Sequence, residues 1–278
     1  MDSSQLLSLS TFGYLFASGA YLAAFLFKSK KAGLAGTILT ALTFLGQTAA
    51  LGLRWYESYQ IGAGHAPLTN MYESLVFFSW SIACFYLIIE YKFKNKTLGA
   101  FAMPFAFFAM AFASSGWVDQ NINPLIPALQ SNWLIAHVVT CFIGYAAFAV
   151  ACGIAVMYLL KSRSPKSSGL LATLPDLKVI DDIIHKSMVY GFLWLSAGII
   201  TGAIWANSAW GTYWSWDPKE TWSLITWFFY AAVLHARFTR GWQGSRIAWL
   251  AIGGFACVVF TYYGVNYLLS GLHSYGAS

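Results

Sequence analysis

Eight apolar segments, each long enough to cross a lipid bilayer, most constrain how this chain can fold. A helix needs roughly 17–25 mostly apolar residues to span the hydrocarbon. Runs of that length occur near residues 5–27, 32–53, 71–91, 97–115, 132–160, 187–206, 219–237 and 246–269. Only 9% of the residues are charged, against roughly 25% in an average soluble domain. The sequence therefore predicts an all-α integral membrane protein, a polytopic bundle of about eight transmembrane helices that forms one membrane domain over residues 1–278.

The distribution of lysine and arginine predicts how these helices cross the membrane. The connections after the first, third, fifth and seventh segments, with Lys178 and Lys186, carry 14 of the 16 cations, and the other side keeps only Arg54 and Lys219. The positive-inside rule makes the cation-rich side cytoplasmic, so both termini are expected to be extracytoplasmic. The polar segment 161–186 is expected to be a cytoplasmic linker that runs into a short amphipathic piece. Because the cations flank apolar runs and form no single patch, they do not indicate nucleic-acid binding.

Residues 205–222 depart from the pattern of an ordinary membrane protein. Five of the 13 tryptophans fall within these 18 residues. Gly211 and Pro218 interrupt the segment, which therefore cannot be one regular helix. The topology places it outside the cytoplasm, where its rings are expected to form a flat aromatic platform at the membrane surface.

Two helix starts carry the pattern of a capping box. In this motif the side chain of the first residue accepts from the backbone amide three residues on, and the side chain of that later residue accepts from the backbone amide of the first. One is Asn70 with Glu73, and the other is Asp217 with Glu220, where Pro218 occupies the first helical position. Asp217 has two candidate roles: it caps the seventh helix, or it contacts a ligand, and the two roles are compatible.

The five histidines divide between the two ends of the expected bundle. The outer end holds His65, His137 and His273, and the inner end holds His185 and His235. Asp217 and His235 are 18 residues apart in one helix, which corresponds to about 27 Å at 1.5 Å per residue. This nearly equals the thickness of the hydrocarbon, so the aromatic platform and His235 are expected at opposite membrane faces.

His137 is a candidate ligand because an ionisable group inside a membrane segment is costly and tends to be functional. With His273 on the same side, it offers two imidazoles for the axial positions of a haem iron. Arg54 is expected to pair with a haem propionate. A haem buried in the bundle commonly uses two histidines of one helix, and no expected helix here carries two. The edge of an outer haem would then rest on Trp210, Tyr213, Trp214 and Trp216.

Several segments are similar to known proteins. Residues Trp210–Trp222 resemble the tryptophan-rich WWD signature of haem-handling proteins. More narrowly, four further segments and His137 resemble the CcsA/ResC-type family of System II cytochrome c biogenesis. Those segments are Gly64–Leu75, Gly202–Asn207, Leu234–Arg237 and Tyr263–Gly276. The resemblance covers most of the chain from about residue 54.

The resemblance implies a function in covalent haem attachment. It implies that His137 and His273 ligate an outer haem b (Fe-protoporphyrin IX), and that His235 contributes to an inner haem site whose second ligand lies on a CcsB/ResB-type membrane protein. The chain would then be part of a holocytochrome c synthase complex in a bacterial inner (plasma) membrane or a thylakoid membrane. It would present haem to the Cys-x-x-Cys-His motif of apocytochrome c, with a separate pathway keeping those thiols reduced.

Alternatives remain at this stage. A System I-type WWD protein would deliver haem to a chaperone, and a small-molecule permease would use the tryptophans only as an interfacial belt. His65 has three candidate roles: haem relay, contact with apocytochrome, or ordering of the outer loop. The four cysteines form no CxxC pair and are expected to be small core residues: Cys84, Cys141, Cys152 and Cys257.

Overall fold

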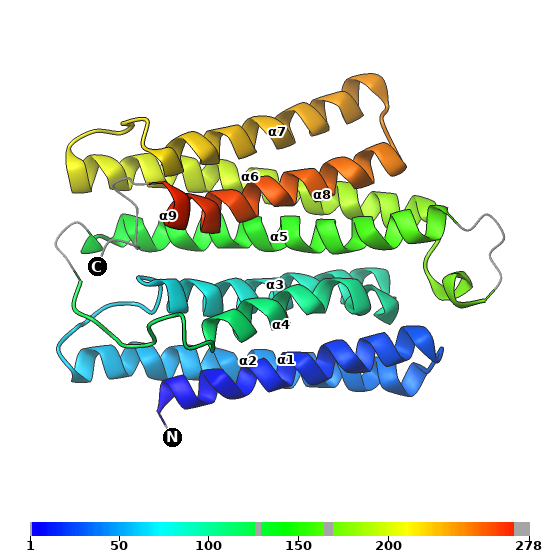
Figure 1. The fold of residues 1–278 in the computed structure, drawn as a ribbon, viewed down its shortest axis with the longest axis horizontal. Helices are drawn as coiled ribbons and strands as arrows, with labels where there is room; N and C mark the ends of the chain where they lie inside the picture. Colours follow the sequence, from blue (N-terminus) through cyan, green and yellow to red (C-terminus); the bar gives the residue numbers. More distant parts are fainter. Residues whose placement is uncertain (1, 126–128, 164–168, 270–278) are drawn as a thin grey trace.

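The computed structural model describes residues 2–125, 129–163 and 169–269, and its regular elements over these residues are all helical (Figure 1). The elements are α1 (Ser3–Leu26), α2 (Lys30–Gln60), α3 (Met71–Phe93), the short 3₁₀ helix η1 (Lys96–Leu98), α4 (Gly99–Ala113), α5 (Asn132–Ser162), the 3₁₀ helix η3 (Leu170–Thr173), α6 (Leu177–Trp210), α7 (Pro218–Arg240), α8 (Ser245–Val259), a π-helical turn (Phe260–Gly264) and α9 (Val265–Leu268). The expected all-α bundle of about eight long helices is confirmed.

The helix boundaries differ most from the expected ones at α6. This helix begins at Leu177, ten residues before the expected apolar segment. Its first turns bury Ile180, Ile183 and Ile184 completely. On the exposed face of the same turns, Lys186 pairs with Asp182 at 2.6 Å. The expected amphipathic piece is therefore the start of α6 and not a separate element.

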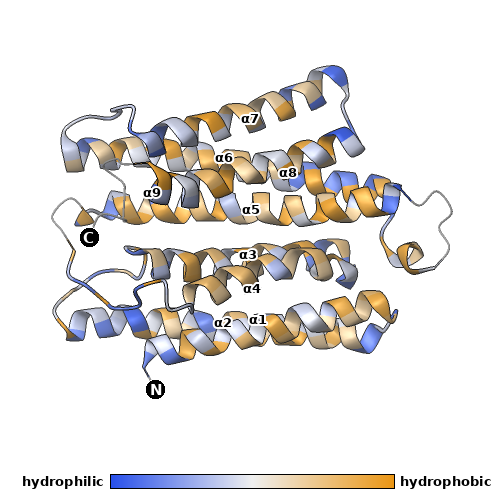
Figure 2. Ribbon diagram, viewed as in Figure 1, coloured by the Kyte–Doolittle hydropathy of each residue, from blue (hydrophilic) through white to orange (hydrophobic). Residues whose placement is uncertain are grey.

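Seven of the described helices are long and apolar enough to span a membrane, and α7 is the long helix that is not among them. With 23 residues, α7 is about 35 Å long at 1.5 Å per residue, and it lies beside α6 and α8 (Figure 1). Both of its ends are polar, which lowers its mean hydropathy. Figure 2 shows the same division in the whole bundle, with apolar residues along the middle and hydrophilic residues at the two ends.

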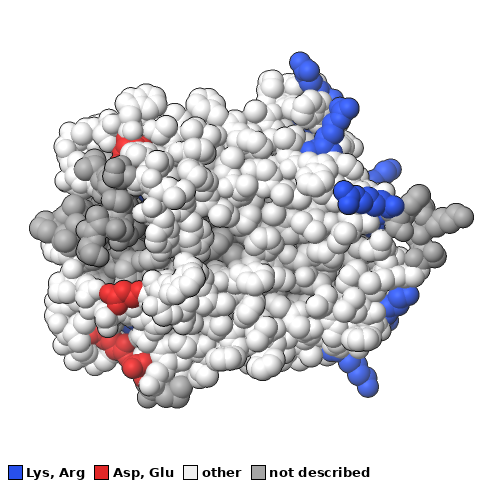
Figure 3. Space-filling model, in the orientation of Figure 1, with Lys and Arg blue, Asp and Glu red and all other residues white. Residues whose placement is uncertain are grey.

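Most of the described cations lie at one end of the bundle, where Glu90, Asp181 and Asp182 pair with some of them. On the face shown in Figure 3, lysine and arginine lie at one end, and aspartate and glutamate lie at the other. The order of the helices puts Arg54 and Lys219 at the end opposite the other described cations. The Trp-rich segment between α6 and α7 is at that same end, as expected.

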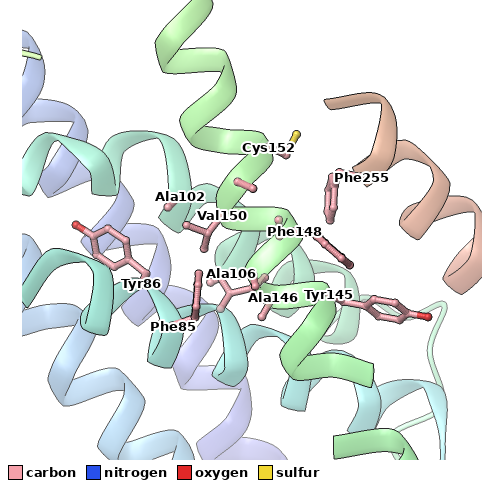
Figure 4. Packing of buried hydrophobic residues seen from close by; sticks show 14 of the residues in the cluster. Phe85, Tyr86, Ala102, Ala106, Tyr145, Ala146, Phe148, Val150, Cys152 and Phe255 are labelled. Atoms are coloured by element: carbon pink, nitrogen blue, oxygen red, sulfur yellow. The ribbon is translucent and has the colours of Figure 1, made fainter. Parts of the chain in front are cut away.

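Helix α5 is the centre of the fold and contacts α3, α4, α6 and α8. Figure 4 shows its side chains packed between those of α3 and α4 on one side and Phe255 of α8 on the other. Glycines let the helices approach closely: a Cβ on Gly144 would lie 3.0 Å from the carbonyl oxygen of Gly191 in α6, and one on Gly153 would clash with that of Phe101 in α4. Such small-residue contacts drive helix association in membranes, where apolar burial alone contributes little.

Polar side chains inside the α1–α4 half pair with one another. The side-chain oxygen of Gln47 accepts from Tyr14 at 2.6 Å, and its nitrogen donates to Ser79 at 2.8 Å. Nearer the cation-rich end, Glu90 accepts hydrogen bonds from Tyr21 and Tyr86, both at 2.6 Å. Because hydrocarbon offers no competing partners, such bonds specify how α1, α2 and α3 align.

The close contact at Gly153 leads to a stability prediction. We expect Gly153→Ala to lower the thermal unfolding midpoint, because the new methyl group meets a backbone oxygen and overpacking costs about 1–3 kcal/mol. Gly46→Ala is the matched control, since a Cβ there meets nothing within 4 Å. Both purified variants are heated in detergent at one scan rate. Equal midpoints for the two variants would contradict the close packing of α4 on α5.

Candidate functional site

A cavity of about 110 Å³, open on one side, lies at the Trp-rich end of the bundle. Side chains from α3, α5, α6, α7 and the π-helical turn surround it. Its wall includes Asn70, His137, Trp205, Trp214, Lys219 and Tyr262. Residues far apart in the sequence therefore meet around one space, and His137, Tyr213 and Trp214 are the expected site residues among them.

His137 is held firmly in the cavity wall by α6. Its Nδ1 lies 2.8 Å from the carbonyl oxygen of Gly198. Because a carbonyl only accepts, Nδ1 carries the proton, and Nε2 is the ring nitrogen that bears a lone pair in the neutral imidazole. The ring lies nearly parallel to that of Trp205, with 16° between the planes and 5.9 Å between the centroids. A Cβ on Gly202 would lie 2.6 Å from Nδ1, so the glycine there provides the space for the ring.

The Trp-rich segment is irregular, as predicted. Helix α6 ends at Trp210, and Gly211 follows in the left-handed conformation with φ of 77°. Trp216 also has a positive φ of 62°, which is uncommon for a bulky residue. Pro218 then begins α7. Two tight backbone turns thus reverse the chain within seven residues.

The indole rings of this segment are inclined to one another, so the expected flat arrangement is wrong for the ring pairs described. Trp205 and Trp210 meet at 63°, and Trp214 and Trp216 meet at 89°. Their exposure also differs, because Trp205 is 3% exposed whereas Trp216 is 69% exposed. The segment therefore has a part that belongs to the bundle and a part that lies at the surface.

Asp217 caps α7, which was one of its two expected roles. Its carboxylate accepts from the backbone amide of Lys219 at 3.0 Å, and the backbone amide of Asp217 donates to the Glu220 carboxylate at 3.2 Å. At α3, Asn70 accepts from the amide of Glu73, but the Glu73 carboxylate reaches back to Thr69 instead. The capping box at α7 is complete, and the one at α3 is displaced by one residue.

Lys219 lines the cavity, although the sequence favoured Arg54 as the cation of the site. Its Nζ donates to the side-chain oxygen of Asn266 in α9 at 2.9 Å. Among the described residues that line the cavity, Lys219 is the cation. Its charge therefore faces the same space as His137.

Arg54 occupies a different place. It is 1% exposed, pairs with Glu73 at 2.8 Å and is not part of the cavity wall described here. Its guanidinium also lies 5.0 Å from the ring centroid of Tyr72. The geometry therefore does not bring Arg54 to a ligand bound at His137.

His65 is 6% exposed, and its two ring nitrogens each lie 3.0 Å from a backbone carbonyl oxygen, those of Ala66 and Asn123. It also lies outside the cavity wall of the described residues. Of its three candidate roles, this geometry favours ordering of the outer loop.

His235 and His185 lie at the opposite end of the bundle from His137. The side chain of His235 is exposed on α7. His185 of α6 meets the ring of Phe238 edge to face at 5.5 Å. The separation of two histidine levels agrees with the helical spacing that predicted it. His273 lies outside the described residues.

Sequence reasoning missed the contribution of the π-helical turn. Thr261 and Tyr262 of this turn both line the cavity, and π turns are rare and frequently lie at functional sites. The hydroxyl of Tyr262 lies 2.6 Å from that of Ser74 in α3. No local residue pattern predicts a π turn. Cys141 also reaches the cavity, and its sulfur lies 3.6 Å from Nδ1 of His137.

The chain is similar to known proteins over most of its length. The family model described as Cytochrome C assembly protein matches residues 68–273. A "Cytochrome c biogenesis protein CcsA" from Guillardia theta is 42% identical over 264 residues, which covers 88% of this chain and 85% of the relative. The protein of the same name from Prochlorococcus marinus (strain MIT 9303) is 41% identical over 270 residues, covering 86% and 83%.

A likeness of fold is also found among solved structures. The structure titled "Cytochrome c Heme Lyase CcmF" matches with a TM-score of 0.68 and 20% sequence identity. The match covers 94% of this chain but 47% of that chain, so this protein spans about half the length of that structure. At this identity the likeness concerns the fold alone.

The cap at α7 separates the two roles of Asp217. We expect Asp217→Ala to destabilise the protein by about 0.5–2 kcal/mol, because an N-cap hydrogen bond is lost. Asp217→Asn keeps an acceptor at the same position and should unfold near the wild-type midpoint. Thermal unfolding of both variants in detergent measures the difference. If Asp217→Asn lowers the midpoint as much as Asp217→Ala, the negative charge of Asp217, and not its cap hydrogen bond, stabilises the protein.

Proposed function

This chain belongs to the Cytochrome C assembly protein family, with relatives of the CcsA type, and we propose that it holds haem b at the cavity beside His137 and presents it to apocytochrome c. As a member of that family it acts in cytochrome c biogenesis. The haem is a substrate that passes through the protein, and the residues around the cavity bind and orient it.

The observation that carries the proposal is the setting of His137. Histidine ligands commonly donate their second ring N–H to a backbone carbonyl, which fixes both the tautomer and the ring orientation. The bond from Nδ1 to Gly198 has this form, and it leaves Nε2 as the nitrogen suited to iron. The parallel ring of Trp205 further limits rotation. His137 is thus oriented before any ligand arrives.

The second axial ligand in this proposal is His273. The family resemblance supports the assignment, since His273 matches the second outer histidine of CcsA-type proteins. Two neutral imidazoles would give a six-coordinate iron. Release then requires the histidine of the apocytochrome Cys-x-x-Cys-His motif to replace one of them.

The size of the cavity limits how haem binds. Ligand pockets for small molecules are usually about 300–1,000 Å³, whereas this cavity measures about 110 Å³. A haem ligated by His137 would therefore project through the open side toward Tyr213 and Trp214, or the loop after Trp210 would move outward. A projecting haem edge suits the reaction, because the cysteine thiols of apocytochrome must add across exposed vinyl groups.

We further propose Lys219 as the propionate partner, in place of Arg54. Lys219 faces the cavity from the first turn of α7, where the helix dipole also favours an anion. The hydrogen bond from Lys219 to Asn266 connects α9, the last described helix, to the first turn of α7.

The remaining steps involve a partner and the other membrane face. We propose that the Trp-rich end is extracytoplasmic, because the cation-rich end satisfies the positive-inside rule. His235, exposed on α7, would bind entering haem together with a ligand from a CcsB/ResB-type protein. The membrane is a bacterial inner (plasma) or thylakoid membrane, and residues 163–176 link α5 to α6 on the cytoplasmic side. The chain is then one component of a holocytochrome c synthase.

The ligand assignment is tested by the reduced-minus-oxidised absorption spectrum of protein purified in detergent with its partner. We expect wild type to show a six-coordinate b-type spectrum, and His137→Ala and His273→Ala should each lose the part of it that comes from the outer haem. Added imidazole should restore it, because it can enter the vacated position and ligate iron.

His185→Ala is the matched control, because it removes a histidine from the opposite end of the bundle, and it should keep the wild-type spectrum. A complete absence of haem from the wild type would remove the proposal and favour a permease that binds no haem. Loss of the spectrum in none of the variants would remove the ligand assignment.

The proposed propionate contact predicts a charge effect. We expect Lys219→Met to weaken haem retention roughly tenfold or more, because a hydrogen bond to a charged group contributes about 1.5–3 kcal/mol. Lys219→Arg keeps the charge and should retain most of the haem. Retention is measured as the haem-to-protein ratio after washing with apomyoglobin as a haem acceptor. Equal retention by the Met and Arg variants would assign the propionates elsewhere.

A further inference from the structure

Arg54 lies at the centre of a buried polar network at the Trp-rich end. Each of its three side-chain nitrogens donates a hydrogen bond: Nε to Glu73 at 2.8 Å, Nη1 to Ser4 at 3.3 Å, and Nη2 to the carbonyl oxygen of Gln120 at 2.9 Å. These partners belong to α3, α1 and the segment after α4. Arg54 itself is in α2, so one side chain connects four parts of the chain.

Glu73 extends this network to the cavity wall. Its Oε1 receives the Arg54 hydrogen bond, whereas its Oε2 accepts from both the backbone amide and the hydroxyl of Thr69 at 2.9 Å. Thr69 stands between Leu68 and Asn70, and both of these residues line the same cavity as His137. The ion pair therefore fixes the short segment that forms one side of the cavity.

A second connection reaches the same segment from the loop after α4. The side-chain amide of Asn70 donates to the carbonyl oxygen of Asn121 at 3.1 Å. That oxygen also lies 3.4 Å from Nη2 of Arg54. Arg54 and Asn70 thus share one backbone acceptor, and a shift of the arginine would displace both the loop and the wall.

We propose that Arg54, through its ion pair with Glu73, is a positioning residue that holds residues 68–70 in the wall of the cavity that His137 also lines. It acts on haem only through that wall. This inference rests on the proposed function for the identity of the ligand, but the placement of the wall does not depend on it.

Burial explains why Arg54 is suited to this role and not to ligand binding. Both Arg54 and Glu73 are 1% exposed. Turning the guanidinium toward a propionate would leave the Glu73 carboxylate buried without its cation, and breaking a buried pair in this way is strongly destabilising. The surrounding hydrogen bonds make the pair favourable as it stands.

The two roles predict opposite effects of one substitution. If Arg54 bound a propionate, Glu73→Gln would release the arginine from its competing carboxylate, and haem retention would stay the same or rise. If Arg54 positions the wall, Glu73→Gln weakens the same connection as Arg54→Met, and both should lower the haem-to-protein ratio on the order of tenfold, which corresponds to about 1.4 kcal/mol of binding free energy. Arg54→Lys should recover part of the loss.

Hydrogen–deuterium exchange of the haem-free protein in detergent gives an independent measurement. We expect faster exchange in residues 66–71 and 119–123 for both Arg54→Met and Glu73→Gln. The matched control is Glu90→Gln, which removes a buried carboxylate from the same half of the bundle at the other end. It should leave exchange in these two segments unchanged.

The outcomes separate this inference from the proposed function. Exchange that rises in both segments supports the positioning role even where the wild type proves to bind no haem, which would remove only the proposed function. Unchanged exchange in Arg54→Met, or haem retention that rises in Glu73→Gln while it falls in Arg54→Met, would overturn the positioning role. Partial unfolding of a variant would raise exchange across the whole chain and not only in these two segments, and that result also counts against the positioning role.

Discussion

The close contact between α5 and α6 is the interaction on which the rest of this structure depends. In lipid, two apolar helices gain little by burying surface, so their association requires backbones that approach closely. Gly144 and Gly191 allow that approach in the middle of the pair. Nearer the Trp-rich end, Gly198 supplies the carbonyl that binds His137, and Gly202 provides the space for its ring. The packing of the two helices and the orientation of the imidazole are therefore one arrangement.

The other half of the bundle is held by buried polar groups at different depths. Gln47 joins α1, α2 and α3 near the middle, Glu90 does so toward the cation-rich end, and Arg54 with Glu73 closes the Trp-rich end. Water cannot replace these partners inside the hydrocarbon, so each group aligns its helices at one level. The bonded hydroxyls of Ser74 and Tyr262 connect this half to the half that carries His137.

Much of the fold could be predicted from the sequence because the bilayer reduces it to a count of apolar runs and a comparison of charges. Position along the bundle axis was predicted well: the described cations and histidines lie at the expected ends, and α3 and α7 have the expected N-cap residues. Position around the bundle was not, since hydropathy and charge say nothing about which helix faces which. Arg54 and Lys219 are at the same end of the bundle, but of the two only Lys219 lines the cavity. The inclination of the indole rings and the π-helical turn likewise depend on tertiary contacts.

The division of the Trp-rich segment follows from the same packing. Trp205 is still within α6 and is buried against His137, so its role is to orient that ring. After Gly211 the chain leaves the helix, and Tyr213 and Trp216 are 60% and 69% exposed. Exposed aromatic rings beside a small open cavity provide surface for a flat ligand that the cavity cannot enclose. A histidine fixed by two helices, next to rings that remain at the surface, is the arrangement that the proposed function requires, in which haem is held by its iron and its edge stays accessible to a second protein.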